Sequence, residues 1–275
     1  MRNIIRFLTT TLVAVLLVCS FCMTASAATT PFIDVDDSDE TLSEAVALLA
    51  HLNVTKGTTE TTFGTVEDVT RQQMAAFIYR FVKQGRTLEN ASNSSTFTDL
   101  SDPTYYGYIS WAAQTGVIKG KSDTEFDPEG YITLQDAYTM ILRALEYDEE
   151  KLELVYPYSY IDIAESENVA LDANLPANLD YTAALTRGNV AVLLYNAFFA
   201  ETGVEEEYSK VKAVGTVNGD TEYAVETGTV HPTFAEYAYD VEVGEFVVII
   251  VVVIIRRCTS SHDSCTHNKR EKKCY

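Results

Sequence analysis

The chain has 275 residues, of which 47% are hydrophobic, and a formal net charge of −20. This is enough apolar material for one or two folded domains, which excludes wholesale disorder. So acidic a protein repels nucleic acids and anionic membranes at long range. We therefore expect no nucleic-acid partner, and any anionic ligand must be held by local basic groups.

The N-terminus has the pattern of a secretory signal peptide, which we predict for residues 1–27. Arg2 and Arg6 precede an apolar run, and the small residues of Ala25-Ser26-Ala27 suit a cleavage site. Residues 28–245 contain no cysteine. We expect this exported part to fold without disulfides.

An internal repeat organises the chain. An aromatic-x-Asp opening occurs three times and is followed each time by a threonine, and these threonines are Thr70, Thr133 and Thr186. The openings are Phe32-Ile33-Asp34, Phe97-Thr98-Asp99 and Tyr160-Ile161-Asp162. Apolar residues follow each threonine at the spacing of one helix face. They are Met74, Phe77, Ile78 and Phe81, then Ala137, Met140, Ile141 and Ala144, then Val190, Leu193, Leu194 and Ala197.

Each threonine is placed to be a helix N-cap, although only Thr70, with Gln73, is predicted to form a full capping box. Helical stretches at 42–52 and 106–114 precede the first two caps. They end at Asn53 and Gly116, residue types that tolerate the left-handed conformation, and we place Asn168 at the same position in the third copy. Helix pairs this short bury too little surface alone, so we predict that three copies pack together in a mainly α fold.

These motifs together resemble the S-layer homology family. The second copy is most similar, through Phe97-Thr98-Asp99-Leu100, the stretch from Trp111 to Gly120, and Ile132-Thr133. Val69-Thr70-Arg71 and Leu185-Thr186-Arg187 carry the resemblance in the other copies. The resemblance implies a pseudo-threefold spindle whose grooves bind a secondary cell-wall polysaccharide or other peptidoglycan-linked polymer, often one with pyruvylated sugars. It thus implies non-covalent anchoring of a secreted protein at the cell wall and cell surface.

We assign the three repeats to residues 28–90, 96–150 and 151–203. A β-rich segment with a hairpin turn at Asn218-Gly219 is predicted for 205–245. The remaining residues, 246–275, hold an apolar run and a basic, cysteine-containing tail. The run, Phe246 to Ile255, is too short for a membrane helix, so we expect no membrane span. The tail differs so much from the rest that we suspect a truncated or frame-shifted end.

The best candidates for polymer binding are Arg71 and Arg187, each directly after a cap threonine. There, backbone N–H groups and a guanidinium can converge on one carboxylate, such as that of a pyruvyl ketal. The alternative is that each arginine pairs with a neighbouring acid. The second copy has Leu134 at this position, and leucine neither carries charge nor donates hydrogen bonds, so we expect its groove to bind weakly or not at all.

Five further residues are candidates for polymer binding, each with a structural alternative. Lys56 and Lys119 either supply a second cation or simply favour the negative end of a helix. Asp34 and Asp99 either bind sugar hydroxyls or form turns and caps. Trp111 either stacks on a sugar or lies in the core.

The chain contains no HExxH, GxSxG, Walker A or GxGxxG pattern. We therefore predict that it is not an enzyme and has no catalytic residues, cofactor or metal site. Two alternatives to anchoring stay open. In the first, the chain is a surface-layer or assembly protein whose repeats serve protein contacts, which predicts self-association. In the second, the chain is the remnant of an anchored, exported hydrolase.

Overall fold

The computed structural model describes residues 30–88, 91–217 and 220–241. The predicted signal peptide, the hairpin turn at Asn218-Gly219, the apolar run and the basic tail lie outside the described residues. The structure is mainly α-helical with one small antiparallel sheet, as predicted. The elements are α2 (Glu40–His51), α3 (Arg71–Val82), the 3-10 helix η1 (Pro103–Tyr105), α4 (Tyr106–Gln114), α5 (Leu134–Ala144), α6 (Tyr158–Ala164), α7 (Arg187–Phe199), β1 (Glu206–Val217), β2 (Asp220–Val230) and α8 (Phe234–Tyr239).

The three predicted capped helices are α3, α5 and α7, and all three threonine caps are confirmed. The hydroxyl oxygens of Thr70, Thr133 and Thr186 each accept a hydrogen bond from the backbone N–H three residues on. Only Thr70 forms the complete capping box, because the Gln73 side chain accepts from the Thr70 N–H in return. The sequence pattern therefore fixed where these helices begin.

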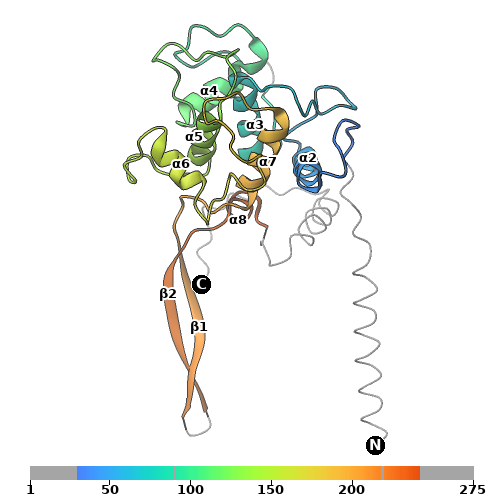
Figure 1. The fold of residues 1–275 in the computed structure, drawn as a ribbon. Helices are drawn as coiled ribbons and strands as arrows, with labels where there is room; N and C mark the ends of the chain where they lie inside the picture. Colours follow the sequence, from blue (N-terminus) through green and yellow to red (C-terminus); the bar gives the residue numbers. More distant parts are fainter. Residues whose placement is uncertain (1–29, 89–90, 218–219, 242–275) are drawn as a thin grey trace, which may run out of the picture.

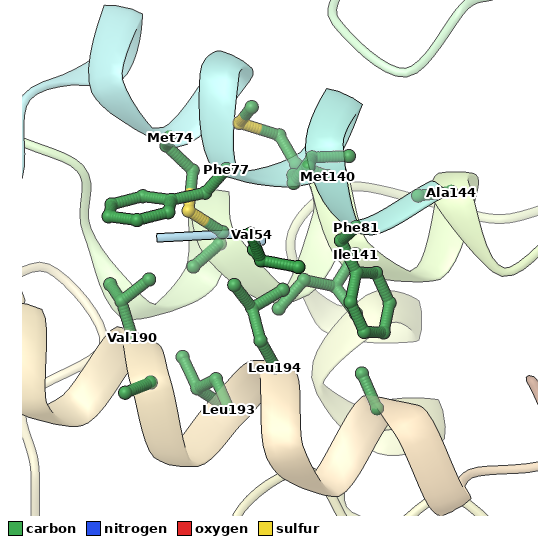
Figure 2. Close-up of a cluster of buried hydrophobic side chains, with 14 of the residues drawn as sticks. Val54, Met74, Phe77, Phe81, Met140, Ile141, Ala144, Val190, Leu193 and Leu194 are labelled. Atoms are coloured by element: carbon green, nitrogen blue, oxygen red, sulfur yellow. The ribbon is translucent and has the colours of Figure 1, made fainter. Parts of the chain in front are cut away.

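The apolar faces of the capped helices meet in a shared core. Figure 2 shows side chains of α3, α5 and α7 directed toward one another, with Val54 among them. Every residue predicted for these stripes is buried. A helix that packs in this way gains most of its stability from the burial of its apolar face and little from its intrinsic propensity.

Each capped helix also packs against the first helix of another copy. The pairs are α3 with α4, α5 with α6 and α7 with α2. The last helix of the repeat region thus packs against its first helix, and the three copies form a closed set in the body of the molecule (Figure 1).

A ring of backbone hydrogen bonds joins the three copies just before the caps. The Val69 N–H donates to the Leu185 carbonyl at 2.9 Å, the Leu185 N–H to the Ile132 carbonyl at 2.9 Å, and the Ile132 N–H to the Val69 carbonyl at 2.8 Å. All three side chains are buried. Buried backbone groups need partners, so this ring both satisfies them and fixes the three helix starts relative to one another.

The helix ends agree with the sequence in the first two copies and differ in the third. Asn53 and Gly116 have positive φ angles of 56° and 77°, as predicted. In the third copy the positive φ belongs to Ala170 and not to Asn168. The predicted opening around Asp162 is also wrong, because these residues lie inside α6. There, Tyr160 receives a hydrogen bond from Arg143 as Tyr108 of α4 does from Arg80, so Tyr160 corresponds to Tyr108 and not to Phe32.

The C-terminal part contains the expected hairpin and one unexpected helix. Strands β1 and β2 pair antiparallel from Glu206↔Val230 to Val217↔Asp220, and the hairpin extends away from the helical body (Figure 1). Helix α8 then returns to the body, where Phe234 stacks on Phe81 with ring centroids 4.6 Å apart. The segment is thus not purely β-rich. The capping box of Thr233 and Glu236 was the sequence signal for α8.

Two glycines provide a matched test of the packing. Gly57 and Gly116 both have positive φ, at 76° and 77°. A Cβ on Gly57 would lie 2.5 Å from the Phe32 ring and 2.4 Å from the Thr62 carbonyl, whereas one on Gly116 would meet nothing within 4 Å. We expect Gly116→Ala to lower the free energy of unfolding by about 1 kcal/mol, the cost of the left-handed backbone alone. Gly57→Ala should cost at least about 2 kcal/mol more, measured by urea unfolding. Equal losses would contradict the close approach of Phe32.

Candidate grooves between the repeats

Arg71 and Arg187 are the first residues of α3 and α7, and both are buried, with only 6% and 7% of their surface exposed. Their backbone N–H groups are already bonded to loops of other copies. The Arg71 N–H donates to the Gly130 carbonyl, and the Arg187 N–H to the Glu67 carbonyl, both at 2.8 Å. The predicted convergence of backbone N–H groups on a ligand is therefore not available at these residues. At Arg71 and Arg187, the groups that can contact a ligand are therefore the side-chain guanidinium groups.

The two guanidinium groups are held in the same way. Arg71 donates from Nε to the Phe126 carbonyl at 3.0 Å, and Arg187 donates from Nε to the Phe63 carbonyl at 2.8 Å. Each guanidinium carbon lies 4.9 Å from the ring centroid of that same phenylalanine. Each arginine thus crosses from its own copy into the loop of another copy. We use the names Arg71 groove and Arg187 groove for the surroundings of these two contacts between copies.

The two grooves differ in charge. In the Arg71 groove, Asp136 pairs with Arg71 at 3.1 Å and with Lys121 at 3.4 Å, and it accepts a hydrogen bond from the Tyr156 hydroxyl at 2.8 Å. Beside it lies a cavity of about 410 Å³ that is lined mostly by acids, including Asp99 and Glu129. This groove already contains the counter-ions of its own cations.

In the Arg187 groove, the guanidinium donates one further hydrogen bond to the described residues beyond its bond to the Phe63 carbonyl, a long one of 3.5 Å from Nη2 to the Thr55 hydroxyl. None of the ion pairs among the described residues includes Arg187. Burial lowers the pKa of Arg187, while the exposed carboxylate of Glu67 acts in the opposite direction. A buried cation without a contacting anion is a costly arrangement that a ligand carboxylate would relieve.

The corresponding position in the second copy has become apolar. Leu134 is buried and lines a cavity of about 300 Å³ together with Leu179, Glu165 and Asp172. Leu179 precedes Thr186 by the same interval as Phe63 precedes Thr70. Both members of the arginine-phenylalanine pair are thus replaced by leucine in this third groove, where the neighbouring charges are acidic.

The lysine candidates also differ from each other. Lys119 pairs with Glu149 at 2.7 Å, and Arg143 contacts the same carboxylate at 3.2 Å. Lys56 is exposed and takes part in no ion pair among the residues that the structure describes. Of the two predicted lysines, Lys56 has the charge that is not already compensated.

The aspartate candidates form loop contacts. The Asp34 carboxylate accepts from the N–H groups of Phe63 and Gly64 at 2.6 and 2.7 Å, and Asp99 accepts from those of Phe126 and Asp127. Burial alone would raise the pKa of both carboxyls, but the backbone hydrogen bonds outweigh it and lower the pKa below its ordinary value. Each aspartate ties the opening of its copy to the phenylalanine that receives an arginine.

Trp111 is partly buried between α4 and α3. Its ring meets the edge of Tyr79 at 5.1 Å between centroids, and Lys83 lies 5.7 Å from the ring. These contacts belong to helix packing. Sequence reasoning missed Lys121, Asp136 and Tyr156, although an acid at the third position of α5, where α3 has Gln73, was a visible signal.

None of the described helices is long and apolar enough to cross a membrane. Within the same residues, no group of histidine, cysteine, aspartate and glutamate side chains is arranged to hold a metal ion.

The repeats match the model of the S-layer homology domain at residues 31–75 and 96–137. These two stretches belong to the S-layer homology domain family. At least two such domains are present, and they correspond to the first two copies. The matched stretches contain both Asp34 and Asp99 and the cap threonines Thr70 and Thr133.

Several curated proteins are similar to part of this chain. A cell surface protein of Thermoanaerobacter kivui is 35% identical over 173 residues, which cover 62% of this chain and 22% of that protein. A middle cell wall protein of Brevibacillus brevis is 29% identical over 219 residues, 74% of this chain and 20% of that protein. An endoglucanase of a Bacillus species is 32% identical over 136 residues, 50% of this chain and 14% of the enzyme. The chain therefore spans about a fifth or less of these relatives.

The Asp99 contacts predict a specific pH dependence. Because the folded-state pKa of Asp99 is lowered, its contribution to stability is complete above the ordinary aspartate pKa of about 4 and is lost as the pH falls through the lowered value. We expect Asp99→Asn to lower the free energy of unfolding by about 1–3 kcal/mol at pH 7, and by less at pH 3. Urea unfolding at the two pH values measures both differences. Asp37→Asn, at an exposed aspartate of the first loop, is the control; a deficit for Asp99→Asn that stays constant with pH would contradict the assignment.

Proposed function

We propose that this chain anchors an exported protein non-covalently at the bacterial cell wall by binding an anionic secondary cell-wall polymer. The observation that supports this best is the Arg187 guanidinium, which is buried between two copies and contacts no carboxylate of the residues that the structure describes. Carboxylates of pyruvylated sugars are the ligand chemistry that such a planar donor suits. A secreted location at the cell wall and surface follows from the same proposal.

The repeats 28–90, 96–150 and 151–203 form, in this proposal, a spindle with pseudo-threefold symmetry. Its support is the backbone ring of Val69, Ile132 and Leu185 and the closed pairing of the helices. Three copies around one axis create three grooves. Their different side chains then decide which groove binds the polymer.

The proposed binding residues are Arg187, Arg71, Lys56 and Lys119. Arg187 and Lys56 come first, because neither forms an ion pair with another described residue. Asp34, Asp99 and Trp111 are assigned to loop closure and helix packing, and not to direct polymer contact. Their contacts described above favour this division.

Three relatives are called a cell surface protein, a middle cell wall protein and an endoglucanase. Proteins with different names thus share sequence with this chain. This favours a common role in attachment, and we propose that the chain itself binds and does not catalyse. The activity of any longer protein is not part of the proposal.

Sedimentation of the whole chain with purified cell walls tests the proposal. We expect the chain to sediment with intact walls and to stay in solution with walls stripped of their secondary polymer. Raised salt should weaken the binding, because it screens the charges. Equal sedimentation with stripped walls would contradict the polymer as ligand, and self-association without any wall material, measured by light scattering, would favour an assembly role.

The arginine assignment has its own variants. We expect Arg187→Gln to lower the affinity for the walls about tenfold or more, as measured by sedimentation, since a charge-assisted hydrogen bond is worth about 1.5–3 kcal/mol. Arg86→Gln removes the same charge at an exposed position beyond the C-terminal end of α3 and should bind as the unmodified chain does. Thermal unfolding of both variants checks that the fold is retained. Equal binding by all three proteins would exclude Arg187 from the site.

A further inference from the structure

The two arginine grooves have the same framework but different charge at one helix position. In α5 the third residue is Asp136, whose carboxylate contacts Arg71. In α3 the third residue is Gln73. Gln73 lies one turn before Phe77, whose ring centroid is 5.1 Å from the Arg187 guanidinium carbon. Gln73 thus occupies in α3 the helix position that Asp136 occupies in α5, and each of these helices follows the loop that receives the arginine of another copy.

The neutral side chain of Gln73 does not compensate Arg187. Its amide oxygen accepts from the Thr70 N–H at 3.0 Å as part of the capping box. Arg187 interacts electrostatically with Glu67, Tyr105 and Asp34. The two carboxylates among them, those of Glu67 and Asp34, form no ion pair with it in the described part of the chain. Asp34 is held by backbone N–H groups of the neighbouring loop.

Asp136, by contrast, neutralises the cations of the Arg71 groove. It is largely buried, with 14% of its side chain exposed, and it contacts Arg71, Lys121 and Tyr156 at once. A carboxylate from outside would have to displace this anion from a cation that is itself buried. Acids of the adjoining cavity, including Glu125 and Asp127, add repulsion.

We propose that Asp136 is a built-in counter-ion that closes the Arg71 groove to carboxylate ligands, so that the chain binds a sugar carboxylate at the Arg187 groove alone. The third groove has Leu134 and offers no cation at this position. This inference rests on the proposed function, because it names which groove takes the polymer. One residue position, Gln73 or Asp136, thus decides whether a groove is open.

The side-chain Nε–H signals of Arg71 and Arg187 in NMR spectra of the whole chain provide the test. The probe is a methyl glycoside that carries a pyruvate ketal. We expect its addition to shift the Arg187 signal and to leave the Arg71 signal in place. An equal shift at both arginines, or a shift at Arg71 alone, would overturn the inference.

A reciprocal exchange of the two side chains tests the cause. Gln73→Asp places an acid beside Arg187 and should weaken probe binding about tenfold or more. It is compatible with the fold, because an acid in the first turn of a helix is favourable. Asp136→Gln should open the Arg71 groove, seen as a second binding site and a shift of the Arg71 signal. Unchanged affinity in Gln73→Asp would overturn the inference even if Asp136→Gln fails to fold.

The outcome also separates this inference from the proposed function. If neither arginine signal shifts while the whole chain still sediments with polymer-bearing walls, the groove assignment is wrong and anchoring stands. If sedimentation does not depend on the polymer, the proposed function fails, whatever the probe does.

Discussion

The structure depends on the ring of three backbone hydrogen bonds that Val69, Ile132 and Leu185 form with one another. Each of these residues directly precedes a cap threonine, so the ring sets the origin of α3, α5 and α7 together. Because it uses main-chain atoms, it places few demands on side chains beyond their burial. A change elsewhere in one copy therefore leaves the relative position of the three helix starts intact, and the grooves between them can diverge separately.

The ring also explains why the arginines are buried. A residue directly after a cap threonine faces the loop of another copy, where its own N–H is taken by a loop carbonyl. The side chain must then run along that loop, and a phenylalanine ring and carbonyl receive the guanidinium at Phe63 and Phe126. The backbone N–H groups of these two phenylalanines donate to the carboxylates of Asp34 and Asp99, which hold the phenylalanines in place. The repeated motifs of the sequence are thus parts of one contact between copies.

The sequence predicted the elements that depend on local pattern. Caps and apolar stripes appear in neighbouring residues, so Thr70 and its counterparts could be placed from spacing alone. The third opening failed because an aromatic-x-Asp triplet is too short to distinguish a loop from a helix, and Asp162 lies in α6. The pairing of Arg71 with Asp136 joins residues far apart in the chain. No spacing rule reveals such a contact until the order of the copies in space is known.

The same reasoning accounts for the unequal grooves. A buried arginine is tolerated where a carboxylate contacts it, as at Arg71, or where a ligand can supply one, as we propose at Arg187. Where neither is present, an uncharged residue is the stable alternative. The third groove has this arrangement, with Leu134 and Leu179 lining one cavity. In our proposal, the three grooves represent three solutions to one electrostatic problem: an internal anion, an external anion, and no cation. Only the second solution would leave part of the stabilising energy to be gained on binding, and for this reason we assign polymer binding to the groove with the least internal compensation.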